Sequence, residues 1–310
     1  MVTDVPTGFK HAFVTGATGI VGSRLCARLV EIGVRVTAYS RTSTCYEQPV
    51  GVSRVSGDIC DVDTLMIASK GADVIFHLAG AVHGSRGTFE GYRDVNVSGT
   101  QSIVETAQSI GAKLIHISTV NVEGFRVGKL TDYYSSTKSQ AEDVIDHAVA
   151  GGLDAVMVRP ATIFGNDSGR AGLIVDRILR GSLSVLPVPS RLISPVWVDD
   201  LVSALINAVD LGQNGRTYTV AGPTMKTSEF VSSICTLVGA SRPLVSIPSW
   251  ALVLPLQLAW WSKGITRWVP PVSVESIKHD SVYDGEKAAF DLRFTYTPLT
   301  EIFSPGNVKY

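Results

Sequence analysis

The first half of the chain alternates short apolar runs with longer amphipathic segments. Apolar runs bounded by polar or glycine residues predict buried strands. Six such runs lie before about residue 160: His11–Thr15, Val34–Tyr39, Val52–Ser56, Ala72–Ala79, Lys113–Ser118 and Ala155–Arg159. Segments with helical apolar spacing lie between most of them, as at Val21, Leu25, Leu29 and Ile32. Strands that alternate with helices predict an α/β fold with a parallel, doubly wound sheet.

The pattern changes after about Pro160, where segments become shorter and the strict alternation ends. Prolines become more frequent there: Pro187, Pro189, Pro195, Pro223, Pro243 and Pro248. We therefore expect one domain over residues 1–165 and a smaller substrate-binding lobe formed mainly by residues 166–310, with some segments returning to the first domain. The apolar run Trp250–Trp261 has 12 residues, whereas a membrane-spanning helix needs about 20. A buried helix of the lobe is favoured over contact with a membrane surface.

Three glycines follow the first predicted strand and open the first predicted helix, in the run Thr15-Gly16-Ala17-Thr18-Gly19-Ile20-Val21-Gly22. Gly16 suits a tight turn, Gly19 lets the backbone approach a pyrophosphate, and Gly22 lets the helix pack closely on the strand. The positive end of the helix dipole then faces the phosphates. A strand, a glycine turn and a helix in this order predict a dinucleotide-binding domain.

Tyr134 and Lys138 lie four residues apart at the start of a predicted helix that runs to about Ala150. Residues with this spacing share one face of a helix. A nearby cation favours the phenolate and lowers the pKa of a tyrosine, which can then exchange a proton with a carbonyl or alcohol oxygen. Tyr133 has Thr137 at the equivalent spacing, so Tyr134 is the candidate. The alternative is a surface tyrosine beside a solvated lysine.

Ser118 and Thr119 end the predicted strand Lys113–Ser118 or follow it directly. Side chains at the carboxyl ends of parallel strands face the edge of the sheet where ligands bind. Thr119 is the candidate to donate a hydrogen bond to the substrate oxygen that Tyr134 protonates. The alternative is a Ser/Thr turn that only satisfies local backbone groups.

Together these motifs resemble the extended short-chain dehydrogenases/reductases of the NAD(P)-dependent epimerase/dehydratase group. Further matches extend over nearly the whole chain: Gly57-Asp58-Ile59, His77-Leu78-Ala79-Gly80, Asn96-Val97-Ser98-Gly99-Thr100, Arg159-Pro160 with Phe164-Gly165, Val196-Trp197-Val198-Asp199-Asp200 and Tyr218-Thr219-Val220-Ala221-Gly222. Two departures are Gly80 for the usual Ala and Phe164 for the usual Tyr. The last two segments match motifs of the smaller lobe. The resemblance implies a Rossmann-type fold.

The resemblance also implies roles for individual residues. Tyr134 would be the general acid/base, Lys138 the ligand of the ribose that also tunes the pKa, and Thr119 the partner of the substrate oxygen. Thr119 is chosen over Ser118 because it lies five residues before Gly124. The implied cofactor contacts are Gly16, Thr18, Gly19, Ile20, Val21, Gly22, Arg41, Asp58, Ile59, Leu78, Ala79, Gly80, Asn96, Tyr134, Lys138 and Pro160. Asn96 is expected to steady the central helix and its loop.

The end of the second predicted strand favours NADP(H) over NAD(H). An Asp or Glu in this region normally binds the ribose 2′-hydroxyl of NAD, but the chain reads Tyr39-Ser40-Arg41-Thr42-Ser43 there. The guanidinium of Arg41 can hold a 2′-phosphate through two hydrogen bonds. The alternative is that Arg41 stacks on the adenine of either cofactor.

Two enzyme interpretations compete. The first is a reductase or dehydrogenase of a secondary alcohol and ketone, since Ile247–Leu254, Pro270-Pro271 and Tyr283–Ala288 resemble the 3β-hydroxysteroid dehydrogenase branch. The second is a nucleotide-sugar epimerase or 4-keto-sugar reductase. That group carries an arginine where this chain has Ile193, although Arg191 lies two residues away. A 4,6-dehydratase fits less well because no acidic pair follows Thr119. A non-catalytic NAD(P)-binding scaffold is a third interpretation.

Composition narrows the partners. The net charge of -1 gives no electrostatic footprint for nucleic acid, so a small-molecule substrate is expected. The four cysteines form no C-x-x-C pair and no metal-ligand spacing, which indicates reduced thiols and no metal site. Residues 1–10 lack the apolar core of a signal peptide, and a cytoplasmic location is expected. The family resemblance implies a homodimer through the helices near Ser98–Ile110 and Tyr134–Ala150.

Overall fold

The computed structural model describes residues 8–41, 50–82, 85, 87–165, 175, 178, 186–189, 191–240, 244–247 and 280–304 of the chain. The chain divides into two compact units. Unit 1 comprises Met1–Pro160, Val198–Val220 and Gly285–Phe294, and unit 2 comprises Ala161–Trp197, Ala221–Asp284 and Thr295–Tyr310. The apolar run Trp250–Trp261 lies outside the described residues.

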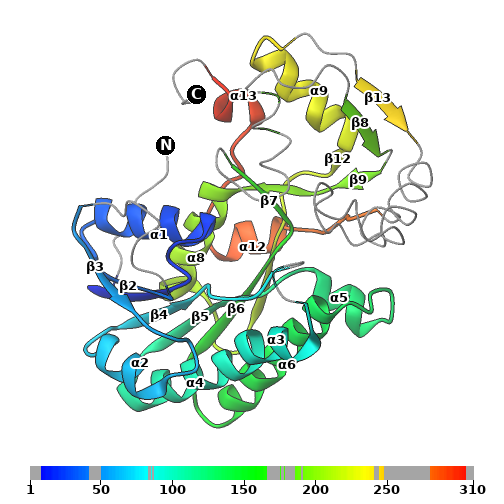
Figure 1. Cartoon of the computed structure of the whole chain (residues 1–310). Coiled ribbons are helices and arrows are strands. Elements are labelled where there is room, and N and C mark those ends of the chain that lie inside the picture. Colours follow the sequence, from blue (N-terminus) through cyan, green and yellow to red (C-terminus); the bar gives the residue numbers. More distant parts are fainter. Residues whose placement is uncertain are drawn as a thin grey trace. The chain divides into compact units, whose positions relative to one another are not determined.

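Unit 1 is built on a seven-stranded sheet with the order β11-β6-β5-β4-β1-β2-β3 (Figure 1). Each neighbouring pair in this sheet is parallel. The strands are β1 (His11–Thr15), β2 (Arg35–Ser40), β3 (Val52–Ser56), β4 (Val74–His77), β5 (Lys113–Ile117), β6 (Ala155–Pro160) and β11 (Thr217–Val220). This order is that of a Rossmann fold, and the predicted doubly wound parallel sheet is confirmed. The order reverses between β1 and β4, which is where such sheets bind their ligands.

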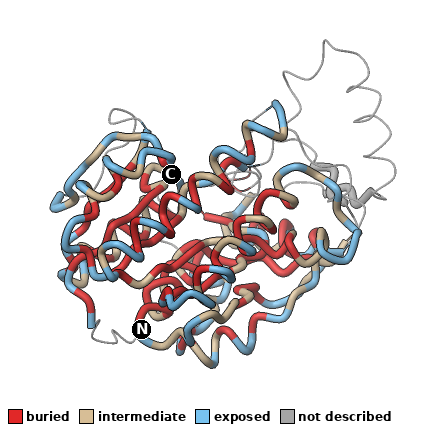
Figure 2. The backbone as a smooth tube through the Cα atoms, turned by 90° about the horizontal axis from the view of Figure 1, so that it is seen from below, coloured by how far each residue is buried: buried red, intermediate tan, exposed pale blue. Residues whose placement is uncertain are grey.

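Helices cover both faces of this sheet (Figure 1). One face carries α1 (Ile20–Glu31), α8 (Val198–Leu211) and α12 (Glu286–Asp291), and the other carries α2 (Val62–Ala68), α4 (Gly99–Ile110) and α6 (Tyr133–Ala150). Shorter pieces are α3 (Phe89–Arg93), the π-helix η1 (Asp94–Ser98) and α5 (Asn121–Arg126). Apolar side chains of the strands pack against those of the helices to form the core. Figure 2 shows the buried residues along the chain in red.

The segment Val198–Val220 corrects one expectation from sequence. The motifs Val196–Asp200 and Tyr218–Gly222 were assigned to the smaller lobe, but Val198–Val220 belongs to unit 1. Its strand β11 pairs in parallel with β6 and forms the edge of the main sheet. Because its neighbour in the sheet lies some 60 residues earlier (Thr217 pairs with Met157), local pattern alone does not reveal the pairing.

Unit 2 contains three two-stranded sheets within the described part of the chain. Their strands are β7 (Thr162–Phe164) with β10 (Pro195–Trp197), β9 (Leu192–Ile193) with β12 (Met225–Lys226), and β8 (Leu186–Pro189) with β13 (Leu244–Ile247). The helices with described bounds in this unit are α9 (Thr227–Leu237) and α13 (Leu299–Ile302). The ring of Phe164 contacts those of Trp197 and Phe230 at centroid distances of 5.4 and 5.1 Å, which gives this unit an aromatic core of its own.

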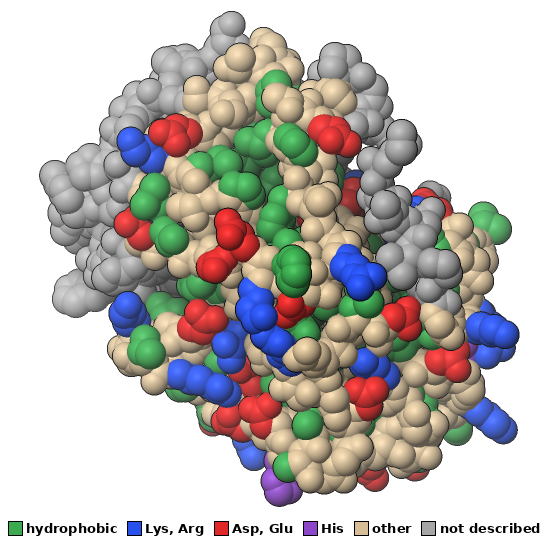
Figure 3. Space-filling model, turned by 180° about the vertical axis from the view of Figure 1, so that it is seen from behind, with side chains coloured by type: hydrophobic (Ala, Val, Ile, Leu, Met, Phe, Trp, Pro, Cys, Tyr) green, Lys and Arg blue, Asp and Glu red, His purple; other side chains and the backbone are tan. Residues whose placement is uncertain are grey.

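The described surface mixes charges of both signs. On the face in Figure 3, lysine and arginine side chains are interspersed with aspartate and glutamate. Among the helices that the structure describes, none is both long enough and apolar enough to cross a membrane.

Candidate active site

The three glycines lie where the order of the sheet reverses, in the turn from β1 to α1. Gly16 has a φ of +68°, and a Cβ there would lie 2.6 Å from the amide nitrogen of Ala79 and from the carbonyl carbon of Leu78. A Cβ at Gly22 would collide with the carbonyl oxygen of Gly16. The amide of Gly19 donates to that same oxygen at 3.0 Å. The turn therefore depends on the absence of side chains, and it packs against the loop after β4.

The start of α1 fits the phosphates of a dinucleotide. Gly19 is the N-cap of this 12-residue helix and has no side chain to cap it. The first turn of the helix, which begins with Ile20 and Val21, contains no acidic residue. The first amides of a helix need an acceptor and favour a negative charge. Thr18, Gly19 and Ile20 are partly or fully exposed, so an anion can reach this turn.

Asn96 ties the loop after β4 to the helix that carries Tyr134. Its Oδ1 accepts the amide of Ala81 at 2.7 Å, and its Nδ2 donates to the carbonyl of Ala81 at 3.2 Å and to Oγ1 of Thr137 at 2.9 Å. The loop Leu78–Gly80, which precedes Ala81, is thereby held beside α6. Both polar atoms of the Asn96 side chain therefore take part in contacts within the protein.

The ends of β2 and β3 bring Arg41 and Asp58 to the same edge of the sheet. Ser40 is the last residue of β2, and Arg41 follows it with an exposed side chain. The hydroxyl of Tyr39 donates to the carbonyl of Asp58 at 2.9 Å, which fixes the turn after β3. Asp58 is exposed, whereas Ile59 is buried in the core. The position next to Arg41 thus carries a serine and no carboxylate.

Tyr134 and Lys138 lie on α6, which begins at Tyr133 because Asp132 caps it. The Asp132 carboxylate accepts an amide of the first turn at 2.9 Å. Tyr134 is partly exposed, whereas Lys138 is only 4% exposed. The Lys138 ammonium donates to the carbonyl of Ile117 at 2.6 Å, and its Nζ lies 3.0 Å from Nε2 of His116. An ammonium has three N–H donors, so these two contacts leave one for a ligand.

Burial lowers the pKa values of Lys138 and of the two histidines near it, His77 and His116. It lowers the pKa of Lys138 from 10.5 to about 8, and the negative charge of Glu142 partly opposes this effect. Burial and the Lys138 charge lower the pKa of His77 to about 3, and the same two causes together with His77 hold the pKa of His116 well below its ordinary value. At neutral pH both imidazoles are uncharged, and His116 can accept a hydrogen bond from Lys138.

The two candidate hydroxyls after β5 have different partners. Ser118 donates to Oε1 of Glu142 at 2.5 Å. Thr119 is 8% exposed, and its Oγ1 accepts the amide of Asn121 at 3.3 Å. No residue that the structure describes is recorded as accepting the hydroxyl hydrogen of Thr119. The carbonyl of Pro160 accepts the amide of Val120 at 3.3 Å, which ties this turn to the end of β6.

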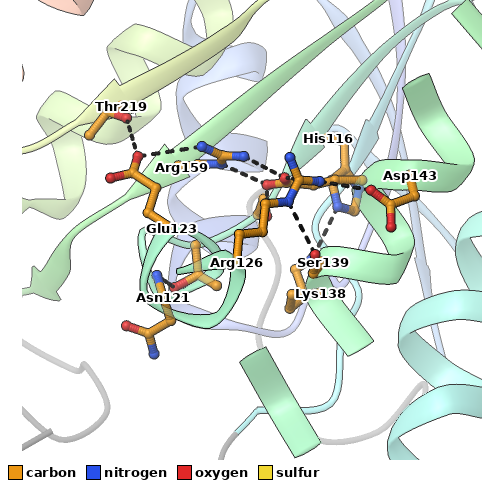
Figure 4. Close-up of polar contacts among 12 residues, drawn as sticks. His116, Asn121, Glu123, Arg126, Lys138, Ser139, Asp143, Arg159 and Thr219 are labelled. Atoms are coloured by element: carbon orange, nitrogen blue, oxygen red, sulfur yellow. Dashed lines mark hydrogen bonds and ion pairs between the residues drawn. The ribbon is translucent and has the colours of Figure 1, made fainter. Parts of the chain in front are cut away.

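A network of ion pairs and hydrogen bonds that sequence reasoning missed is centred on the buried carboxylate of Glu142. Glu142 and Arg159 form its centre, and Arg126, Ser139, Asp143, Glu123 and Thr219 surround them (Figure 4). Arg159 was noted only as part of a family motif, and Glu142 was not singled out. The available signal was a glutamate four residues beyond Lys138 on the same helix. Its partners come from separate elements, and local spacing does not reveal them.

The fold and the glycine turn define a dinucleotide-binding α/β protein, and the helix that presents Tyr134 and Lys138 defines a short-chain dehydrogenase/reductase. A family model for the NAD dependent epimerase/dehydratase family matches residues 12–221. The chain belongs to this family, which confirms the resemblance seen in the sequence and the prediction of an NAD(P)-dependent enzyme of the extended short-chain type.

Relatives and solved structures agree with this membership. A 2-alkyl-3-oxoalkanoate reductase of Stenotrophomonas maltophilia (strain K279a) is 28% identical over 251 residues, which cover 74% of this chain and 76% of that protein. A 3-beta-hydroxysteroid dehydrogenase of Mycolicibacterium neoaurum is 26% identical over 326 residues, which cover 94% and 88%. The structure of a UDP-glucose 4-epimerase from Thermotoga maritima with UDP-glucose shares the fold, with a TM-score of 0.75, 18% identity and coverage of 94% and 96%.

Proposed function

We propose that the protein is an NADP(H)-dependent reductase or dehydrogenase that interconverts a ketone and a secondary alcohol on an apolar skeleton. The observation that carries the proposal is the buried ammonium of Lys138, four residues from Tyr134 on α6. A buried cation at this spacing favours the phenolate form of a tyrosine on the same helix face. Bound at the glycine turn, the dinucleotide supplies the hydride for reduction or accepts it for oxidation.

In this proposal the side chains handle the proton and hold the substrate oxygen. Tyr134 gives its hydroxyl proton to the carbonyl oxygen during reduction and takes a proton from the alcohol during oxidation. Thr119 donates a hydrogen bond to the same oxygen. Lys138 holds the ribose with its remaining N–H donor and stabilises the phenolate of Tyr134. Gly16, Gly19 and Gly22 shape the turn that holds the phosphates.

The end of β2 supports NADP(H) as the cofactor. A carboxylate at this strand end would accept the ribose 2′-hydroxyl of NAD and repel a 2′-phosphate. Here the strand ends at Ser40 and is followed by the exposed guanidinium of Arg41. A guanidinium binds a phosphate through two hydrogen bonds. Ile59, Leu78 and Pro160 would be further contacts of the dinucleotide.

Two observations support an apolar substrate. The named relatives are a 2-alkyl-3-oxoalkanoate reductase and a 3-beta-hydroxysteroid dehydrogenase, and both names denote chemistry at a ketone or alcohol on an apolar skeleton. In addition, Ile193 is a buried residue of β9, at the position where nucleotide-sugar enzymes of the family carry an arginine. The C-terminal part of the chain is proposed as the substrate-binding lobe.

A direct comparison of substrates tests this proposal. Purified protein would be given NADPH or NADH with androstanedione and with ethyl β-oxododecanoate, and kcat/KM would be measured for each pair. UDP-glucose and UDP-galactose would be assayed separately for epimerised product. We expect reduction of a ketone with NADPH to be the faster reaction. Robust epimerisation without net consumption of the cofactor would contradict the proposal and favour a nucleotide-sugar epimerase.

A homodimer is part of the same proposal. Helices α4 and α6, the expected interface, lie side by side on one face of the sheet (Figure 1). Light scattering of the purified chain distinguishes a particle of twice 33.1 kDa from one of 33.1 kDa.

A further inference from the structure

Glu142 is a buried anion one helical turn beyond Lys138 on α6. Its side chain is 1% exposed. Arg159 donates to both of its oxygens, from Nε to Oε1 at 2.8 Å and from Nη2 to Oε2 at 2.6 Å. Ser118 donates to Oε1 at 2.5 Å, and Nη2 of Arg126 lies 3.3 Å from Oε2. Buried carboxylates need such partners, and these contacts hold the Glu142 carboxylate in one position.

We propose that Glu142 is a positioning residue for the Tyr134–Lys138 pair and for Thr119. It fixes the turn after β5 through Ser118, and its charge keeps Lys138 protonated. The inference rests on the proposed function, because it assigns Glu142 a task in the reaction attributed to those three residues.

The positioning of Thr119 follows from the backbone around Ser118. The amides of Ser118 and Val120 donate to the carbonyls of Val158 and Pro160 at 2.7 and 3.3 Å, so the ladder between β5 and β6 continues past the end of β5. Neighbouring side chains on an extended backbone point to opposite sides. With the hydroxyl of Ser118 held by Glu142, the side chain of Thr119 is turned away from the network, which leaves it available to a substrate.

The support of the Lys138 charge follows from what surrounds its ammonium. The buried groups next to it are the neutral rings of His116 and His77 and the carbonyl of Ile117. These groups carry no negative charge. Burial lowers the pKa of Lys138, and Glu142, four residues along the helix, is the charge that opposes this effect. Loss of Glu142 would therefore favour a neutral lysine.

The cations beside Glu142 are shared with other carboxylates, so they do not cancel its charge toward Lys138. Arg159 also pairs with Glu123 of α5, with Nη1 3.4 Å from Oε1. Arg126 donates to Asp143 at 2.8 Å. Asp146 also lies on α6, and the charges of Arg126 and Arg159 act on it as well. Glu142 differs from these carboxylates in being buried and one turn from Lys138.

The direction of the effect on pH dependence is the same for both members of the catalytic pair. Without the Glu142 charge, the ammonium of Lys138 loses a stabilising anion and its pKa falls. The phenolate of Tyr134 loses a repelling anion, so its pKa also falls. Lys138 and Tyr134 titrate as a coupled pair. The alkaline limb of activity therefore moves to lower pH whether it reflects the loss of a proton from Lys138 or from Tyr134.

The test is Glu142→Gln, which removes the charge and keeps the shape. The matched control is Asp143→Asn, which makes the same change one residue further on at a side chain that is 66% exposed and also contacts Arg126. For each variant, the pH dependence of NADPH affinity would be measured by fluorescence titration, and that of kcat with ethyl β-oxododecanoate. Glu142→Gln should move both alkaline limbs down by about one pH unit, and Asp143→Asn by much less.

A second pair of variants separates position from charge. Ser118→Ala removes the hydrogen bond to Glu142 without changing any charge, and Ser139→Ala is its control on the edge of the network. We expect Ser118→Ala to lower kcat between about tenfold and hundredfold, with the alkaline limb and the affinity for NADPH unchanged, and Ser139→Ala to resemble the wild type. If Glu142→Gln does not fold, Ser118→Ala and its control Ser139→Ala still test the inference.

Two results would overturn the inference: alkaline limbs that stay in place or move equally in Glu142→Gln and Asp143→Asn, or a wild-type kcat in Ser118→Ala. Tyr134→Phe in the same assays distinguishes this failure from failure of the proposed function. If Tyr134→Phe loses turnover while Glu142→Gln and Ser118→Ala behave as wild type, only the inference about Glu142 is wrong. If Tyr134→Phe keeps wild-type turnover, the proposed reaction itself is wrong.

Discussion

The turns after β1 and β5 lie at the same edge of the sheet, but opposite features of their residues determine their structures. The turn after β1 depends on atoms that are absent, because a Cβ at Gly16 or Gly22 would strike neighbouring backbone. The turn after β5 depends on side chains that are present and buried, with Lys138 against His116 and with Glu142 against Ser118. A backbone turn can bind a phosphate of any dinucleotide, whereas proton transfer needs particular side chains with particular charges.

The contrast predicts two kinds of variant. Added atoms in the glycine turn should weaken cofactor binding and leave the bound chemistry intact. Loss of the Tyr134 or Ser118 hydroxyl should lower turnover and leave cofactor affinity largely intact, whereas loss of the Glu142 charge should change the pH dependence of both. The comparison would be wrong if a glycine-turn variant changed turnover at saturating cofactor, or if loss of a hydroxyl around α6 weakened cofactor binding.

The largest expected effect on cofactor affinity is that of Gly22→Ala. The added methyl group meets the carbonyl of Gly16, which is backbone and cannot move aside. Overpacking of this kind costs about 1–3 kcal/mol, and we expect the Kd for NADPH to rise by up to about a hundredfold, with kcat at saturating cofactor little changed. Fluorescence titration measures the Kd. Gly87→Ala is the control, since a Cβ there meets nothing within 4 Å; equal Kd values for the two variants would contradict the expectation.

Lys138→Met should reveal the burial of the ammonium as a pH-dependent difference in stability. The pKa of Lys138 is about 8 in the folded protein and 10.5 ordinarily. Between these values the unfolded chain binds more protons than the folded one, so the stability of the wild type rises with pH across that window. The methionine variant lacks this contribution. From pH 7 to pH 10.5 the wild type should therefore gain about 2–3 kcal/mol relative to the variant.

Urea unfolding of both proteins at several pH values measures this difference. Taking the difference cancels the titration of those groups whose pKa does not depend on the charge of Lys138. Loss of the contacts to Ile117 and His116 shifts the variant's stability by a nearly constant amount and leaves the slope intact. A difference that does not change with pH would show that Lys138 titrates normally in the folded protein.

A smaller effect is expected of Ser40→Asp on cofactor preference. A carboxylate at the end of β2 would repel a 2′-phosphate and accept a 2′-hydroxyl. The preference should move from NADPH toward NADH by at least about tenfold, or about 1.4 kcal/mol, in the ratio of kcat/KM values. If the wild type already prefers NADH, the proposed role of Arg41 is wrong.

The same contrast explains how much the sequence could predict. The six early strands and the glycine turn were predicted with bounds within a few residues of those observed, because strand length, glycine spacing and helical periodicity are local properties. Tyr134 and Lys138 were also found locally, from their spacing on one helix. The partners of Lys138 and Glu142 come from β5, β6 and α5, and strand β11 joins the sheet from the second half of the chain. Only the fold brings these segments together.

The central claim is that Tyr134 transfers the proton, whereas the glycine turn only binds the phosphates of the cofactor. Tyr134→Phe tests it most directly, because it keeps the ring and removes the hydroxyl. NADPH affinity and the single-turnover rate of ketone reduction would be measured on the same preparation. The account predicts a rate lower by roughly 10²–10⁴-fold with nearly unchanged affinity for NADPH. A wild-type single-turnover rate in Tyr134→Phe would contradict it.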